Sequence, residues 1–422
     1  MLHIQNIRTD KEGIIKSLAI KNFDAATLIN RVLEVDAHKR ELQKKYDTSQ
    51  AEIKSISETI GKLFKTGKAT EAEELKKKTA DLKIATKSLS DALTNAEKDL
   101  EKLLIQIPNV PHKDVKPGKS SDDNEVLHSE GRIEGAEGLL PHWDITAKYN
   151  LIDFETGAKI TGAGFPVYKG KGVKLQRALI NFFLDKAIEN GYTEVQPPLF
   201  VNEASAFATG QLPDKDGQMY HIASENFYLI PTAEVPVTNI YRDMLMAEAD
   251  LPVKNVAYTP CFRREAGSYG KDVRGLNRLH QFDKVEIVQI QKPEKSYESL
   301  EEMRHYVCEL LRLLELPFRV LRLCGGDISF TAALTYDMEV YAKGQKKWLE
   351  VSSVSNFEAF QSYRMKLRYR DSNKKTQLLH TLNGSALALP RIMAALIENN
   401  QTKHGVKIPE CLLDYTGFEI IN

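Results

Sequence analysis

The sequence has few cysteines, no long apolar stretch and no excess of charge of either sign. Its 422 residues include only four cysteines, and none of them lies in a C-x-x-C pair or another metal-ligand spacing. We therefore expect reduced cysteines in or near a core, and no zinc site. No apolar run reaches the roughly 18 to 20 residues that a membrane span requires, and the N-terminus M-L-H-I-Q-N-I-R lacks a signal-peptide core. We expect a cytoplasmic protein without a membrane partner.

The overall charge is balanced, with 58 Lys and Arg against 58 Asp and Glu. A nucleic-acid surface would therefore have to arise from local segregation of charge, because the total predicts none. With 42% hydrophobic and 27% charged residues the composition is that of a globular protein. A chain of 422 residues exceeds what one core usually organises, so we expect two or more domains.

Two heptad patterns in residues 27–105 predict two coiled-coil helices, with Asp24 as a plausible N-cap for the first. Thr66-Gly67-Lys68 breaks the pattern, so the helices should fold back on each other as an antiparallel hairpin. In the first helix the apolar rows are interrupted by Ser49 and Lys39. The rows contain Leu28, Val35, Leu42, Ile56 and Leu63, then Val32, Tyr46, Ile53 and Ile60, and in the second helix Leu75, Leu82, Leu89, Ala96 and Leu103, with Leu93 and Leu100.

Each half of residues 27–105 would form a helix roughly 60 Å long at ~1.5 Å per residue, so the hairpin should project as an arm. Taken alone, such an arm is as consistent with a dimerisation or spacer coiled coil as with nucleic-acid binding. Lysines gather near and beyond its middle and could contact phosphates, although acidic residues are interspersed. They are Lys44, Lys45, Lys54, Lys62, Lys65, Lys68, Lys76, Lys77 and Lys78.

After the arm, Pro108 and Pro111 end the helix, and the polar residues 111–135 predict a linker between residues 1–110 and a second domain, 136–422. In that domain Leu175 to Asn190 predicts a helix whose apolar stripe includes Ile188, and Gly191 follows it. A strand then runs to Pro198.

Residues 259–287 predict a strand, a long basic loop and a returning strand. Strand periodicity would place Arg263 and Glu265 on one face. An ordinary hairpin with a solvated charged face is the simple alternative. Several guanidiniums beside carboxylates and an aromatic ring, however, suit a ligand that carries phosphates, a base and an amine. The returning half alternates in the same way at Arg278, His280, Phe282, Lys284 and Glu286.

Three further segments carry polar groups next to predicted strands. The run Y-L-I-P-T-A-E-V-P-V brings Thr232 and Glu234 to a strand end, where both could simply cap the next helix. L-E-V-S-S, with Glu350 and Ser353, would by itself be an amphipathic strand. L-N-G-S-A-L-A-L-P-R-I predicts a strand followed by a helix that carries Arg391.

Together these segments closely resemble the class II aminoacyl-tRNA synthetases in their seryl, bacterial-type form. Residues 175–201 resemble motif 1 of that family. Residues 259–287, with F-R-x-E, R-E-A-G-S-x-G-x-D-x-R-G-L and H-Q-F-D-K-V-E, resemble motif 2, and residues 380–399 resemble motif 3. Ala386 and Pro390 replace glycines of motif 3. The resemblance implies an α+β fold: an antiparallel catalytic sheet flanked by helices, preceded by a helical arm.

The resemblance also implies the ligands and their residues. The substrates would be L-serine and ATP, with Mg²⁺ held at Glu350 and Ser353, and the catalytic residues would be Arg263, Arg278 and Glu350. ATP would be bound by Arg263, Arg264, Glu265, Arg278, Phe282, Glu350, Val351, Ser352, Ser353 and Arg391. Serine would be bound by Thr232, Ala233, Glu234, Arg263, Glu286 and Ser385.

In this family the arm grips tRNA(Ser), and the catalytic unit is a homodimer. The implied activity is formation of seryl-adenylate and transfer of serine to the 3′ end of tRNA(Ser), possibly also of tRNA(Sec). Two alternatives remain. A paralogue without catalysis would lack Arg263, Glu286 or Glu350, and a ligase that charges a carrier protein would lack the arm. The sequence has all four features.

Overall fold

The computed structural model describes residues 1–265 and 274–422. They form two compact units, one made of residues 1–19 and 23–108 and the other of residues 20–22 and 109–422. Within the described part of the chain, no helix has both the length and the apolar character that crossing a membrane requires.

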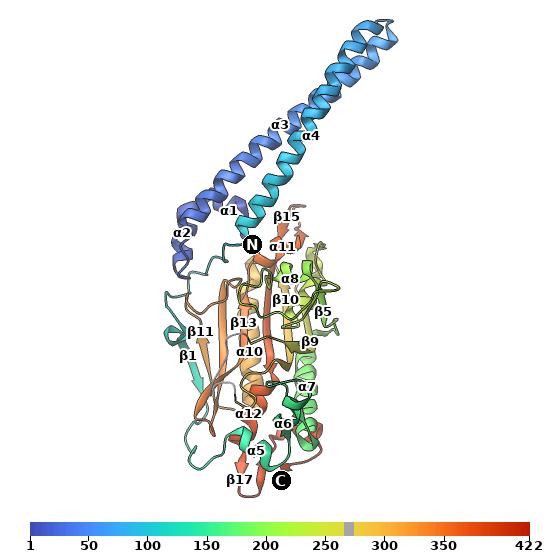
Figure 1. The fold of residues 1–422 in the computed structure, drawn as a ribbon. Coiled ribbons are helices and arrows are strands. Elements are labelled where there is room, and N and C mark those ends of the chain that lie inside the picture. The colour runs from blue at the N-terminus through green and yellow to red at the C-terminus, as the bar shows by residue number, and fades with distance from the viewer. Residues whose placement is uncertain (266–273) are drawn as a thin grey trace. The chain divides into compact units, whose positions relative to one another are not determined.

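The first unit is dominated by a hairpin of two long helices (Figure 1). α3 (Ala26–Lys65) and α4 (Ala69–Leu104) pack along their length, and α1 (Ile4–Thr9) and α2 (Lys11–Ala19) precede them. Gly67 makes the turn with a φ of 76°, which glycine adopts without steric cost. The predicted coiled-coil arm is thus confirmed. The predicted N-cap is one residue off: Ala25 holds that position, and Asp24 accepts a bond from the amide of Ala26 at 3.4 Å.

Both polar interruptions of the first heptad pattern have partners on α4. The Ser49 hydroxyl bonds the Thr86 hydroxyl across the seam, and Lys39 Nζ lies 3.0 Å from a Glu97 carboxylate oxygen. Thr86 is buried, and its hydroxyl also donates to the Leu82 carbonyl. The sequence pattern showed only Leu93 and Leu100 of this row, because alanine and threonine occupy its first half at Ala72, Thr79 and Thr86. A buried polar pair restricts the register in which the two helices can pack.

The second unit is built on a sheet of eight described strands in the order β1-β11-β12-β13-β16-β10-β9-β4. All neighbours are antiparallel except β4 and β9, which are parallel. The antiparallel class II sheet is therefore confirmed. Its strands are β1 (Glu125–Glu130), β11 (Phe318–Arg322), β12 (Leu334–Ala342), β13 (Lys347–Asn356), β16 (His380–Ala388), β10 (Gln281–Gln291), β9 (Val253–Phe262) and β4 (Thr193–Glu194).

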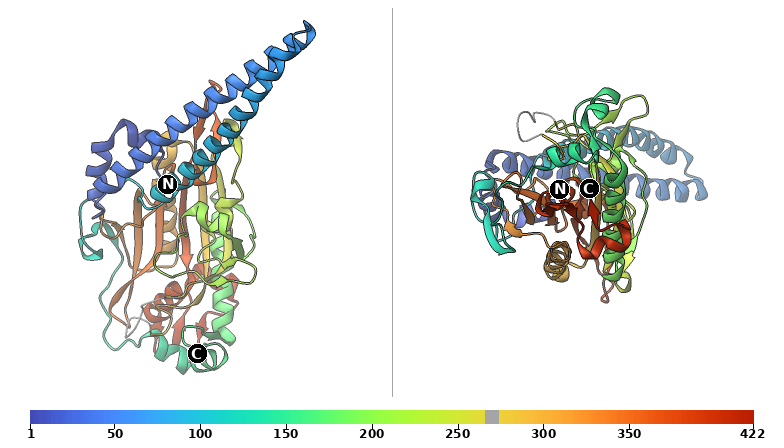
Figure 2. Two further views of the ribbon diagram at one scale, coloured as in Figure 1. Left: turned by 45° about the horizontal axis from the view of Figure 1, so that its top comes forward. Right: turned by 90° about the horizontal axis from the view of Figure 1, so that it is seen from below.

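Three helices pack on this sheet and form the main core with it. α7 (Gly170–Glu189), green in Figure 2, contacts β9 and β10, whereas α10 (Ser296–Leu313) and α12 (Leu389–Asn399) contact the strands between β10 and β12. Their buried side chains alternate with the helical period. The core includes Leu175, Leu179 and Phe182 of α7, Met303 and Val307 of α10, and Ile392 and Leu396 of α12.

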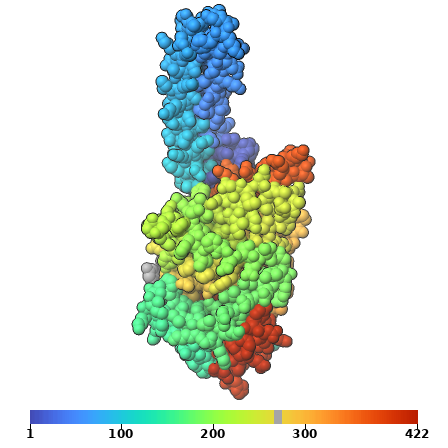
Figure 3. Space-filling view, turned by 90° about the vertical axis from the view of Figure 1, so that its right-hand side faces the viewer, coloured from blue at the N-terminus to red at the C-terminus, as the bar shows by residue number. Residues whose placement is uncertain are grey.

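Shorter elements surround the sheet. Figure 3 looks onto the side whose surface is formed mostly by the green-to-yellow segments that include α7, β5 and β9. The remaining helices are α5 (His142–Lys148), α6 (Phe154–Ile160), α8 (Glu203–Thr209), α9 (Glu234–Asn239), α11 (Phe360–Met365) and α13 (Leu413–Thr416). The small sheets contain β2 (Ile152–Asp153) with β3 (Val167–Tyr168), β5 (Phe200–Asn202) with β7 (Phe227–Leu229) and β6 (His221–Ile222), β8 (Leu245–Ala247) with β14 (Arg368–Arg370) and β15 (Thr376–Leu378), and β17 (Gln401–Thr402) with β18 (Gly405–Lys407) and β19 (Ile420–Ile421).

Two local expectations are wrong. The segment predicted as a linker, 111–135, contains β1, an edge strand paired with β11. Its side chains are exposed on both faces, so no apolar alternation marks it in the sequence. The helix predicted from Leu175 begins at Gly170, and Ile188 is 47% exposed instead of buried.

The Ser49–Thr86 pair predicts a distinct response to single and double substitution. Thr86→Val keeps the shape but leaves the Ser49 hydroxyl without its partner, at a cost of about 1 kcal/mol. Amide exchange of arm peptides, measured by mass spectrometry on the full chain, should become about fivefold faster. Adding Ser49→Ala should return it toward wild type. Equal exchange in the single and double variants would show that the pair contributes nothing.

Candidate functional site

The centre of the site is a buried ion pair on β10. Lys284 Nζ lies 2.6 Å from Glu286 Oε2, and their side chains are only 6% and 1% exposed. Glu286 also accepts hydrogen bonds from the Ser385 hydroxyl at 3.2 Å and from the side-chain amide of Asn383 at 2.9 Å. Both residues lie on the neighbouring strand β16. A carboxylate this deep in the protein is tolerated because Ser385 and Asn383 donate hydrogen bonds to it and Lys284 opposes its charge.

A second layer reaches this pair from the turn before α9. Lys284 Nζ donates to the Thr232 hydroxyl at 2.9 Å, and the same hydroxyl accepts the Glu234 amide at 3.2 Å. Ala233 holds the N-cap position of α9, and Thr232, one residue earlier, binds the first amide of the helix and also belongs to the site. Glu234 accepts a bond from Gln361 Nε2 at 2.7 Å. The structure thus brings together the predicted residues Thr232, Glu234, Glu286 and Ser385.

Glu234 has a strongly perturbed acidity. Burial raises the pKa of its carboxyl to about 7, and the negative charge of Glu286 acts in the same direction. The hydrogen bond from Gln361 and the charges of Lys284 and Arg263 oppose the shift. A buried carboxyl that titrates near neutral pH is typical of a functional site.

Arg263 and Phe282 lie at the end of the β9–β10 hairpin. The Arg263 guanidinium carbon is 5.2 Å from the centre of the Phe282 ring, and its Nε donates to the Pro231 carbonyl at 3.2 Å. β9 ends at Phe262, so Arg263 and Glu265 do not share a strand face as expected. β10 likewise begins only at Gln281, after Arg278 and His280.

Glu265 and Arg278 pair with each other. Arg278 Nη1 lies 2.8 Å from Glu265 Oε2. The backbone of Glu265 has a φ of 48°, a left-handed conformation that residues other than glycine rarely adopt. The left-handed backbone turns Glu265 out of the strand direction and toward the arginine. Residues 266–273, which belong to the long basic loop predicted within residues 259–287, lie outside the described part of the chain.

Arg391, in the first turn of α12, is held by backbone oxygens. Its Nη1 donates to the Glu350 carbonyl at 2.7 Å, and its Nε donates to the Asn277 carbonyl at 3.1 Å. The Glu350 carboxylate is 3.5 Å away. Both carbonyl bonds fix the plane of the guanidinium, as a stacking surface requires.

Sequence reasoning missed Asp337, which stands opposite Ser353 in the β12–β13 ladder. Burial first, and then the charge of Glu350, hold its pKa well above the usual range. Its Oδ1 has no hydrogen-bond partner among the described residues. The neighbouring ladder pair is Glu339 with Glu350. Three oxygen donors, Asp337, Glu350 and Ser353, thus lie on two adjacent strands, and oxygen is the donor that Mg²⁺ prefers.

Several predicted residues do not present side chains to the site. Val351 is buried in the main core, and Ala233 is fully buried. The buried Ser352 hydroxyl donates to the Ser385 carbonyl at 2.6 Å, which joins β13 to β16. Arg264 is exposed. Sequence reasoning also missed Lys284 and Gln361 as site residues. For Lys284 the signal in the sequence was the alternation that places it in one row with Phe282 and Glu286.

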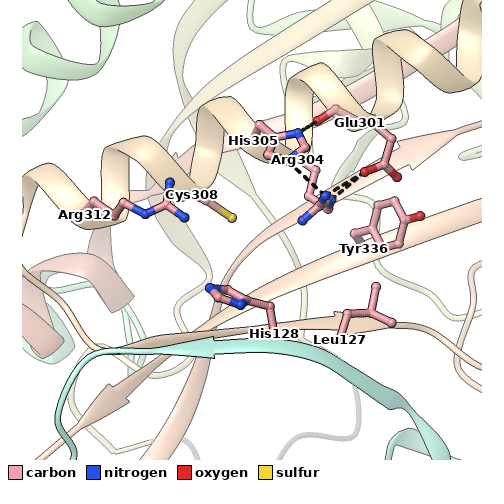
Figure 4. Close-up of a pocket in the computed structure, with 8 residues that line it drawn as sticks. All are labelled: Leu127, His128, Glu301, Arg304, His305, Cys308, Arg312 and Tyr336. Carbon is pink, nitrogen blue, oxygen red and sulfur yellow. Dashed lines mark hydrogen bonds and ion pairs between the residues drawn. The ribbon is translucent and has the colours of Figure 1, made fainter.

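A pocket of about 350 Å³ lies apart from these residues, between β1, β12 and α10 (Figure 4). Its arginines already have carboxylate partners: Arg304 lies 2.7 Å from Glu301, and Arg312 lies 3.0 Å from Glu130. None of the predicted site residues lines it. We therefore place the functional site at β9, β10, β13 and β16.

This antiparallel sheet, with its arginines, its aromatic ring and its buried carboxylates, has the form of the catalytic core of a class II aminoacyl-tRNA synthetase. The family model "tRNA synthetase class II core domain (G, H, P, S and T)" matches residues 220–400, and "Seryl-tRNA synthetase N-terminal domain" matches residues 1–111.

Full-length relatives narrow the class. The Serine--tRNA ligase of Salinibacter ruber is 49% identical over 421 residues, which cover 99% of this chain and 98% of the relative. A crystal structure of seryl-tRNA synthetase from Pyrococcus horikoshii, complexed with ATP, superposes with a TM-score of 0.91 at 33% identity and covers 100% and 99% of the two chains. The cytoplasmic enzyme of Naegleria fowleri with AMP gives a TM-score of 0.87 at 26% identity, with the same coverage. This chain belongs to the seryl-tRNA synthetase family.

The Lys284–Glu286 pair predicts a large difference between breaking and replacing it. Lys284→Met leaves Glu286 buried without its counter-charge and should cost about 3 to 5 kcal/mol. Lys284→Met with Glu286→Gln removes both charges and should recover most of that loss. Urea unfolding followed by circular dichroism measures both. A single variant as stable as wild type would refute the importance of the pair.

Proposed function

We propose that the chain activates L-serine with ATP and transfers the seryl group to the 3′ end of tRNA(Ser). The observation that supports this proposal is the pairing of Glu286 with Ser385 between β10 and β16, with Arg263 directly after β9, the strand that pairs with β10 on its other side. The first step joins a serine carboxylate oxygen to the α-phosphorus and breaks its bond to pyrophosphate. In the second step a terminal ribose hydroxyl of the tRNA attacks the seryl carbonyl, and AMP leaves.

Arg263 is proposed to bind the α-phosphate and the serine carboxylate, where it offsets the charge that builds on phosphorus. Phe282 and Arg391 would stack on opposite faces of the adenine. The two backbone carbonyls that hold Arg391 support this role, because they fix its plane before ATP arrives. No residue need exchange a proton; positioning and electrostatics are enough for phosphoryl-type transfer.

Arg278 is proposed to hold the γ-phosphate. Its Nη1 lies 2.8 Å from the Glu265 carboxylate, so a bound γ-phosphate would take the place of that carboxylate. The exchange would release Glu265 to contact the adenine. One event therefore supplies both of these proposed ATP contacts.

The donor set at Glu350, Ser353 and Asp337 fits Mg²⁺, and the unpartnered oxygen of Asp337 is an additional place for an ion or its water. When bound with ATP, the ion would screen the phosphate charges. Glu350 and Ser353 would hold it, and Asp337 would orient the Ser353 hydroxyl opposite it in the ladder.

Serine would bind over the Lys284–Glu286 pair, with Thr232, Glu234 and Ser385 around it. A pocket built to hydrogen-bond a hydroxyl rejects alanine strongly, by up to about 10⁴-fold, because its buried groups would go unpaired. Since Lys284 already compensates Glu286, the ammonium of serine needs the second carboxylate, Glu234. The arm would bind tRNA(Ser), in a cytoplasmic homodimer where the arm of one subunit serves the other; tRNA(Sec) is a further possible substrate.

Pyrophosphate exchange with each amino acid tests the proposal. Exchange should require serine, and Glu286→Gln should reduce it by at least about 100-fold, because the serine hydroxyl loses a charged buried acceptor and Lys284 loses its counter-charge. Removing residues 34–99 of the arm should preserve exchange and abolish charging of tRNA(Ser). Exchange that does not depend on serine would refute the specificity, and charging by the shortened chain would refute the role of the arm.

Glu234 predicts the pH dependence of serine binding. Its pKa is raised to about 7, so the carboxyl is largely neutral below that pH and cannot balance an ammonium. The KM for serine should therefore fall as pH rises from about 6 to 8, by less than about tenfold per unit. Glu234→Gln should remove the slope. The same raised pKa lowers stability as pH rises from about 4.5 to about 7, since the fold favours the protonated form. A pH dependence of the KM for serine that persists in Glu234→Gln would assign the titration to another group.

A further inference from the structure

We propose that the buried pair His142–Glu398 positions the residues that bind ATP. With Gln345 it forms a clamp, defined here as these three residues, which fixes the backbone before Arg278 and orients Arg391. The proposal rests on the ATP roles given above to the two arginines.

Glu398 is the anchor of the clamp. It lies in the last turn of α12, and its side chain is fully buried. Its Oε1 accepts the His142 amide at 2.9 Å, the His142 ring Nδ1 at 2.7 Å and the Gln345 side chain at 2.8 Å. Its Oε2 accepts the Gln345 amide at 3.0 Å. Four donors thus replace the water that a carboxylate would otherwise need.

These partners assign the tautomer of His142. Because Glu398 offers an acceptor, Nδ1 carries the ring proton, and Nε2 is left as an acceptor. Nε2 receives the amide of Leu276 at 2.8 Å, and both residues are buried. The imidazole therefore links Glu398 of α12 to the backbone amide of Leu276, two residues before Arg278, and holds that backbone in place.

The backbone at this point is shaped for the imidazole. Gly275 has a φ of 67°, and a Cβ there would lie 2.2 Å from His142 Nε2. Only glycine lets the chain approach so closely. Next to it, the Arg274 guanidinium lies 4.8 Å from the centre of the Trp143 ring, so two successive residues of this segment rest on α5.

A second branch leads to Arg391. The Gln345 side-chain oxygen accepts a hydrogen bond from the Asn277 side-chain amide at 2.8 Å. The backbone carbonyl of Asn277 accepts a hydrogen bond from Arg391 Nε at 3.1 Å. Leu276 and Asn277 are thus both tied to the clamp, and Arg278 follows them directly in the chain. The arginines proposed for the γ-phosphate and for the adenine share one buried support.

The resemblance gives His142 and Glu398 no contact with either substrate. As a mere core pair, they would affect stability and change all kinetic constants alike. As a positioning device, they would affect the ATP constants alone, because Thr232, Glu286 and Ser385 make none of the clamp contacts.

The first test is pyrophosphate exchange by His142→Phe and His142→Gln in the full chain. Phe fills a similar volume but leaves the Leu276 amide without its acceptor and removes one of the four donors to Glu398, and the KM for ATP should rise about tenfold. The KM for serine should change less than about twofold. Gln can again accept the Leu276 amide and should recover part of the ATP effect. Val307→Ala, a core substitution in α10, is the control for lost stability.

The second test needs no activity. Amide exchange of the peptide that contains Leu276 should become faster in His142→Phe, and peptides of α7 and α10 should be unchanged. ATP constants that match those of Val307→Ala, or unchanged exchange at Leu276, would overturn the clamp. If His142→Phe does not fold, Gln345→Met removes the second branch and one donor to Glu398 but leaves the His142 ring in place, and it must raise the KM for ATP; an unchanged value would also overturn the proposal. Lack of serine-dependent exchange by the wild-type chain would instead overturn the proposed function.

Discussion

The buried Lys284–Glu286 pair is the interaction on which the arrangement of the catalytic unit depends. Two opposite charges in the middle of a sheet need partners on both sides, and the neighbouring elements supply them: β16 gives Ser385 and Asn383, and the turn before α9 gives Thr232. Because removal of any one donor leaves charge or polarity unpaired, the strands can pair in only one register.

The groups proposed to bind ATP follow a different rule, since each of the three arginines has partners within the protein. Arg263 lies against Phe282 and donates to a carbonyl, Arg278 pairs with Glu265, and Arg391 donates to two carbonyls. The cost of ordering these long side chains is therefore met during folding and not during binding. The pair with Glu265 alone must open, which makes it the adjustable part of the site.

Much of this could be read from the sequence. Heptads located the arm to within a few residues, and the residues between Arg263 and Glu286 were identified because their types suit a nucleotide and an amine. Features that depend on distant partners could not be predicted. Lys284 and Asp337 gain their significance from strands that pair across the fold, and His142 meets Glu398 from 256 positions away. β1 has no apolar face, so only its pairing with β11 identifies it. The turn at Glu265 depends on Arg278, which strand periodicity does not consider.

The polar crossings of the arm have a consequence for its evolution. Ser49 meets Thr86, and Lys39 meets Glu97, at fixed heights on opposite sides of one turn at Gly67. An insertion in one helix would shift every crossing beyond it out of phase. The hairpin can therefore lengthen or shorten only by matched changes in both helices, in steps of one heptad, or about 10 Å. Related proteins with arms of other lengths should therefore differ by whole heptads inserted or deleted in both helices, so that the arm can take only a discrete set of lengths.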